Sequence, residues 1–295
     1  MGQVRWKIGR QLLMGLLLAV TVSGCGLTVR QKAALNSFSA ATQEFSTGAQ
    51  TEFQKNRQDV IEMNLFRFEL GDDKVQLAEL DRLLTRERVQ TRLTALQALE
   101  DYAALLRKLI GAVPDGELLE ASDKFVSNLG HVKGVSLSDE QAEGIGKAVA
   151  AVGGLYVEHK RAHAVRQVVE TANQPIESVV NLLKEDLDPN GSGWSAGYKL
   201  AASKLESHAL KVGGPVSPQD LASKYLVFKA QAMAAENTTR FDVVSSELIG
   251  LASGVAEAQQ NLLQVVNASD FNVENVQQFA KKVREFKSIY GLLRH

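Results

Sequence analysis

The chain has 295 residues, with 33 basic and 34 acidic side chains and a formal charge of −1 at pH 7. A nearly neutral chain without a block of basic residues has no electrostatic basis for binding nucleic acid. The single cysteine, Cys25, excludes an internal disulfide and a zinc site built from several cysteines. Only five prolines occur and strand-like alternation is scarce, which favours an all-α protein.

The first thirty residues have the layout of a secretory signal. Arg5, Lys7 and Arg10 precede an apolar run from Leu12 to Val22, and small residues follow. This run is much shorter than the ~20 residues that a membrane-spanning helix needs. We therefore expect residues 1–24 to be a cleaved signal peptide.

Val22, Ser23, Gly24 and Cys25 end this segment. They resemble the lipobox of bacterial lipoproteins, in which an aliphatic residue and two small residues precede an invariant cysteine. The resemblance implies that the Cys25 thiol carries a diacyl lipid, with chains such as palmitate, after cleavage just before it. Two or more acyl chains hold a protein stably in a bilayer, whereas one holds it only marginally. Apart from this covalent lipid, no cofactor is expected.

The residue after the cysteine predicts the location. In enteric lipoproteins, Asp at this position retains the protein in the inner membrane, and this chain has Gly26. We therefore expect a lipid-anchored envelope protein of the outer membrane, facing the periplasm, with residues 25–27 as its anchor. Removal of residues 1–24 leaves 30 basic and 34 acidic residues, a formal charge of −4.

Residues 28–295 repeat apolar positions at steps of three and four, as packed helices do. The spacing predicts helices over 28–70 and about 75–113, with Asp73 and Gln76 as a capping box between them. So short a connection predicts an antiparallel hairpin. The first helix has this spacing at Leu35, Phe38, Thr42, Phe45 and Ala49.

Further helices follow after residue 113. Ser138 and Gln141 form a capping box that opens a helical segment to about residue 187, with a kink expected at Pro175. The other expected helices cover 117–129, about 195–211, a segment starting at Ser217, and 273–293. The longest seam runs through Phe241, Val244, Leu248, Leu251, Val255, Ala258, Leu262 and Val265.

Helices of this length predict the shape of the protein. A segment of about 40 residues is roughly 60 Å long as a helix. We therefore predict an elongated antiparallel helical bundle with coiled-coil-like seams over 28–295, divisible into sub-bundles over 28–135 and 136–295.

Residues 186–197 contain a candidate calcium loop. Asp186, Asp188 and Asn190 occupy the first three ligand positions of an EF-hand. Gly197 stands where that loop needs a bidentate Glu, so any calcium binding should be weak. A plain turn between helices uses the same residue types and is the favoured interpretation.

His159 and His163 are candidate ligands for a transition metal, because residues four apart share one face of a helix. Glu170 is nearby, but the sequence does not form the His-Glu-x-x-His motif. Solvated histidines on the surface of a bundle are therefore the favoured interpretation.

Small residues every fourth position indicate close helix packing, either within the bundle or in a membrane. The first set is Gly146, Ala150 and Gly154, and the second is Gly250 and Gly254. Both runs are too short to span a bilayer, which favours packing within the bundle. The last helix also carries Lys281, Lys282, Arg284 and Lys287 beside its seam, which suits either a solvated face or an anionic surface.

No catalytic triad, phosphate-binding loop or dinucleotide motif stands out, which argues against an enzyme. The sequence therefore predicts a non-enzymatic adaptor or scaffold that binds another envelope protein or forms a homo-oligomer. One alternative is a membrane-active protein that resembles helical pore-forming toxins and releases an apolar patch such as 148–157. The other is a metal-binding lipoprotein that uses His159 and His163.

Overall fold

A computed structural model of the protein describes residues 26–111, 113–135, 137–152, 158–214, 221–268 and 270–292. The regular structure of these residues is helical, which confirms the predicted all-α class. The predicted signal peptide and the lipobox lie outside them. The helices are α2 (Val29–Glu69), η1 (Leu77–Glu79), α3 (Arg86–Ile110), α4 (Asp115–Gly130), α5 (Asp139–Ala150), α6 (Glu158–Leu187), α7 (Trp194–Val212), α8 (Leu221–Asn267) and α9 (Glu274–Leu292).

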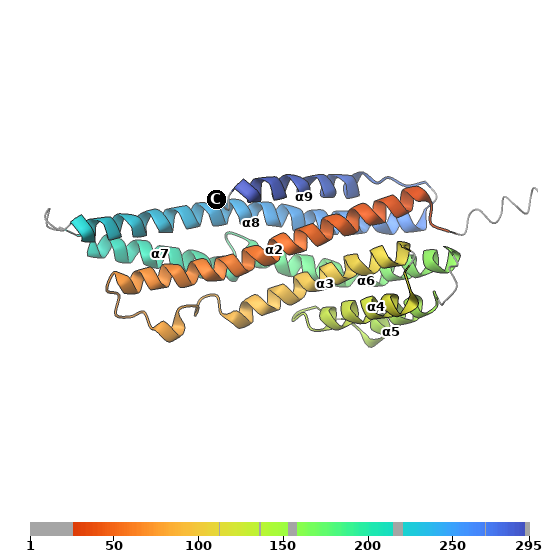
Figure 1. The fold of residues 1–295 in the computed structure, drawn as a ribbon, viewed down its shortest axis with the longest axis horizontal. Helices are drawn as coiled ribbons and strands as arrows, with labels where there is room; N and C mark the ends of the chain where they lie inside the picture. The colour runs from red at the N-terminus through yellow and green to blue at the C-terminus, as the bar shows by residue number, and fades with distance from the viewer. Residues whose placement is uncertain are drawn as a thin grey trace, which may run out of the picture.

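The helices lie along one long axis and form an elongated bundle (Figure 1). α2 and α3 are antiparallel neighbours, and α4 and α5 pack beside α3 and α6. α6 and α7 follow one another in the same direction, and α8 returns beside both. α9 lies on α2 and α8. The bundle therefore has two distinct ends: α2 begins and α8 finishes at one, and α7 finishes and α8 begins at the other.

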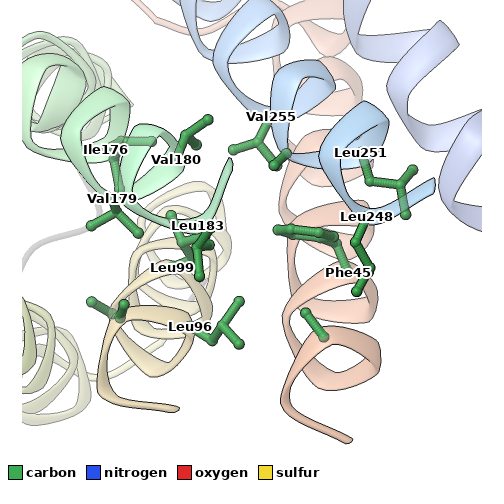
Figure 2. Close-up of a cluster of buried hydrophobic side chains, with 14 of the residues drawn as sticks. Phe45, Leu96, Leu99, Ile176, Val179, Val180, Leu183, Leu248, Leu251 and Val255 are labelled. Carbon is green, nitrogen blue, oxygen red and sulfur yellow. The ribbon is translucent and has the colours of Figure 1, made fainter. Parts of the chain in front are cut away.

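The apolar seams form the core, as predicted. All eight seam residues of α8 from Phe241 to Val265 are buried, and so are the five of α2 from Leu35 to Ala49. Figure 2 shows α2, α3, α6 and α8 converging at mid-length, where Phe45, Leu99 and Leu248 are among the packed side chains. One continuous core includes residues on both sides of the division at 135/136.

The predicted start of the second long helix is wrong. α3 begins at Arg86 and not near residue 75, because Thr85 is its N-cap and accepts a hydrogen bond from the Arg88 N–H at 3.3 Å. The preceding segment is instead a loop with a short 3-10 turn. The Asn64 side chain holds this loop by donating to the Leu80 carbonyl at 2.7 Å. The two helices still form the predicted antiparallel hairpin, joined by a longer connection.

Two capping boxes fix helix starts. Ser138 and Gln141 form the predicted one at the start of α5. Thr28 and Gln31 form another at the start of α2. The segment predicted from residue 139 to 187 is divided into α5 and α6, and Pro175 lies inside α6.

Candidate functional site

The predicted anchor would join the chain at the end of the bundle where α2 begins. Val22, Ser23, Gly24 and Cys25 are outside the described residues, but α2 starts only four residues after Cys25. The Gln31 amide donates to the Val265 carbonyl at 2.7 Å, which ties the first turn of α2 to the last turn of α8. A lipid on Cys25 would therefore be attached at this end.

The candidate calcium loop connects α6 and α7, and its first residue already has a partner. Both carboxylate oxygens of Asp186 accept hydrogen bonds from the Arg92 guanidinium, at 2.7 and 2.5 Å. Asp188 accepts from the Asn190 N–H at 2.9 Å, as in an ordinary turn. Calcium binding would require Asp186 to leave Arg92, and the calcium site stays a prediction.

His159 and His163 both lie on the exposed side of α6. Glu170 is further along that helix, where it accepts a hydrogen bond from the Asn267 amide at 2.8 Å. Within the described residues, no three or more His, Cys, Asp or Glu side chains gather as a metal site would require. The transition-metal site is thus an untested prediction that the described geometry does not support.

The small residues predicted to allow close helix packing differ in their surroundings. A Cβ atom on Gly254 would lie 3.0 Å from the Phe279 ring, so this glycine lets α9 approach α8 closely. Gly146 and Gly250 face open space instead. The side chains Lys281, Lys282, Arg284 and Lys287 of α9 are all exposed. None of the described helices combines the length and the apolar character that crossing a membrane requires.

A cluster of charged side chains that the sequence did not predict lies inside the bundle. Arg240 of α8 bonds to Glu52 at 3.0 Å and to Asp59 at 2.9 Å, both on α2. Glu52 and Asp59 are only 1% and 3% exposed. Burial alone would lower the pKa of Arg240, but its hydrogen bonds and the charges of the two carboxylates outweigh this and raise the pKa above its usual range.

Two tyrosines extend this cluster to the neighbouring helices. The Tyr290 hydroxyl of α9 donates to Glu52 at 2.9 Å, and the Tyr198 hydroxyl of α7 donates to Asp59 at 3.1 Å. Burial, with the nearby Asp59 carboxylate, raises the pKa of Tyr198 well above its ordinary value, so it stays a neutral donor. We call Glu52, Asp59, Tyr198, Arg240 and Tyr290 the buried charge cluster; it fixes α2, α7, α8 and α9 in one arrangement.

Exposed apolar side chains, the opposite of buried charges, gather at the end where α7 finishes and α8 begins. Residues 210–214 and 221–228, which we call the α7–α8 tip, carry apolar side chains on the outside. Figure 1 shows this tip at the far end of the bundle from the start of α2. Of the eleven exposed large apolar side chains in the described residues, five belong to it: Leu210, Val212, Leu221, Tyr225 and Phe228.

The exposure at the tip is large. Phe228 is 67% exposed, Tyr225 65% and Leu210 60%. Fully burying a Phe or Leu side chain is worth about 1.5–3 kcal/mol. Because these side chains stay exposed in the folded chain, that free energy would be gained only if something covered the tip. Single exposed apolar residues are ordinary, whereas groups of them on one surface are typical of binding sites, so this group of five makes the tip a candidate binding surface.

A hollow of about 460 Å³ opens between the two helices of the tip. Leu210, Val227 and Phe228 give it apolar walls, and Lys224 is at its edge. Gly213 is required there, because a Cβ atom on it would lie 2.8 Å from the Val227 side chain. The apolar surface of the tip is therefore concave.

No protein-family model, curated protein or solved structure matches this chain. A proposal for the function therefore rests on the surface of this chain and on the resemblance of residues 22–25 to a lipobox.

Proposed function

We propose that this protein is a non-enzymatic adaptor of the bacterial envelope, anchored by acyl chains on Cys25, that binds another envelope protein through the α7–α8 tip. The observation that carries the proposal is the group of exposed apolar side chains at this tip. Such groups are typical of protein-binding surfaces.

The position of the tip supports an adaptor. The anchor would be attached at the end where α2 begins, whereas the tip is at the other end of the long axis. α8 has 47 residues and connects the two ends. A helix of that length is roughly 70 Å long, so the tip would stand well away from the membrane that holds Cys25.

The interior supports the same role. An adaptor has to hold its binding surface at a fixed place relative to its anchor. The buried charge cluster joins α2, which follows the anchor, to α7 and α8, which carry the tip. Hydrogen-bonded charges inside a low-dielectric core tolerate few alternative arrangements, so the bundle should act as a rigid spacer.

The test is crosslinking in intact cells, with partners identified by mass spectrometry and Cys25→Ala examined in parallel. We expect one dominant envelope protein crosslinked to the anchored chain and lost in the Cys25→Ala variant. Mass spectrometry of the mature amino terminus should find acyl chains on Cys25. Crosslinks only between copies of this chain would replace the adaptor by a homo-oligomer, and an unacylated Cys25 would remove the anchor.

A further inference from the structure

We infer that the α7–α8 tip recognises a protein segment that presents one bulky apolar side chain flanked by acidic side chains. This inference rests on the proposed function, because it names the chemistry of the partner that the tip would bind. Two properties of the tip carry it: its hollow and its charge.

The hollow suits a single anchoring side chain. It is lined by the apolar side chains of Leu210, Val227 and Phe228, by the polar side chains of Lys224 and Gln231, and by two glycines, Gly213 and Gly214. A volume of about 460 Å³ gives room for an aromatic or leucine side chain of the partner. Interfaces commonly gain most of their affinity from such an anchor in a pocket, surrounded by weaker contacts.

The one charged side chain that lines the hollow is positive. It is Lys224, and Lys211 follows Leu210 on α7, whereas Lys229 of α8 lies over the Phe66 ring of α2, 5.4 Å from its centre. From residue 207 to 235 the only acidic residue is Asp220, which is outside the described residues. The chain after Cys25 has a net negative charge, so the positive charge at this surface is opposite in sign to the net charge of the chain. Lysines beside an apolar pocket complement carboxylates on a partner.

Two other occupants fit less well. A second copy of this chain would bring lysines against lysines if the same surface met itself, and like charges facing one another disfavour that contact. An anionic bilayer would match the lysines and the aromatic residues. A flat lipid surface, however, offers no discrete group to fill a hollow between two helices. A protein side chain does.

The test is selection of a random peptide library on the full acylated chain in lipid nanodiscs, followed by affinity measurement with the selected synthetic peptides. We expect the peptides to share one Phe, Trp or Leu next to Asp or Glu. Phe228→Ser and Lys224→Glu should each weaken binding by about tenfold or more. The matched controls are Leu200→Ser, an exposed leucine of α7 outside the tip, and Lys281→Glu, an exposed lysine of α9. Both should bind as the unchanged chain does.

Several results would overturn the inference. The first three are selected peptides without acidic residues, Lys224→Glu binding the peptides as tightly as the unchanged chain, and no enrichment of any peptide in the selection. The fourth is a tip that self-associates or binds anionic vesicles through Phe228 and Lys224 instead. Circular dichroism shows whether each variant is folded. If peptides bind as expected but no partner is crosslinked in cells, the adaptor proposal fails and the chemistry of the tip stands. If a cellular partner is crosslinked elsewhere on the bundle and no peptide is selected, the inferred chemistry of the tip fails and the adaptor role stands.

Discussion

The middle of the bundle and its α7–α8 tip reverse the usual distribution of side chains. In the middle, Glu52 and Asp59 are charged and buried, and the side chain of Arg240 is only 11% exposed. At the tip, Tyr225 and Phe228 are apolar and exposed. Charged groups inside a protein are tolerated only when they are paired and hydrogen bonded, and the middle meets that condition. The apolar groups of the tip have no such compensation within the described chain.

The difference separates two tasks within one fold. The middle contributes to holding the helices in register, and its side chains are engaged with one another. The five exposed apolar side chains of the tip contribute little to folding, because they remain largely in water. Changes in the middle should therefore lower stability, whereas changes at the tip should lower binding and leave stability unaltered.

The largest effect is expected for Arg240→Ala. Removing this guanidinium leaves Glu52 and Asp59 buried without their main partner, which costs about 3–5 kcal/mol in the free energy of unfolding. Urea unfolding measures it. Arg284→Ala on the exposed side of α9 is the control and should stay within about 0.5 kcal/mol of the unchanged chain. Equal stability of the two variants would mean that the cluster does not hold the middle together.

Among the charged side chains, Arg92→Ala should have the next largest effect. It removes both hydrogen bonds to the buried Asp186, and the guanidinium also lies 5.7 Å from the centre of the Trp194 ring. We expect a loss of about 2–3 kcal/mol because a charged acceptor loses its donors. Trp194 is the only tryptophan after residue 24, so its fluorescence should change in the same variant. An unchanged spectrum with full stability would show that this joint between α6 and α7 does not depend on Arg92.

A smaller, pH-dependent effect is expected at Asp72, in the connection between α2 and α3. Burial raises the pKa of Asp72, but hydrogen bonds from Arg67 and the Lys74 N–H, with the Arg67 charge, outweigh this and hold the pKa below its ordinary value. The stabilisation is present above the unfolded-state pKa and is lost as the pH falls through the lower folded-state value. Asp72→Asn should therefore be less stable than the unchanged chain near neutral pH, and this difference in stability should narrow as the pH falls below the ordinary pKa of an aspartate. Urea unfolding at several pH values measures this difference, and a constant difference would contradict the pairing.

The smallest effect on stability is expected at the tip. Leu210→Ser and Phe228→Ser should each change the free energy of unfolding by less than about 0.5 kcal/mol, because both side chains are already in water. Leu205→Ala, on the buried side of the same helix α7, should cost about 2–5 kcal/mol. Thermal unfolding of the three variants gives the comparison. A destabilised Phe228→Ser would show that the tip is part of the folding core.

The sequence predicted the helical class and the seams well, because apolar spacing reflects burial directly. It also located the capping box of Ser138 and Gln141, since such a box is local in the chain. It misplaced the start of α3, because Asn64 holds the preceding loop through a contact sixteen residues away. Local patterns do not record a hydrogen bond of that kind.

The buried charge cluster could have been found in part. The seam of α2 continues past Ala49 through Glu52, Asn56 and Asp59 at steps of four and three, so polar residues occupy core positions. Their partner Arg240 is about 180 residues further along the chain, and only the fold brings it there. The hollow at the tip likewise requires α7 and α8 to be placed against one another.

The most direct test of the account is photocrosslinking in cells from single positions of the anchored chain. A photoreactive residue is introduced at Leu210 or Tyr225 of the tip, and at Leu200, Val243 or Lys282 outside it. We expect one envelope protein to be crosslinked strongly from the two tip positions and weakly from the other three. The same protein crosslinked chiefly from α9 or from the middle of α8 would contradict the assignment of the tip as the binding surface.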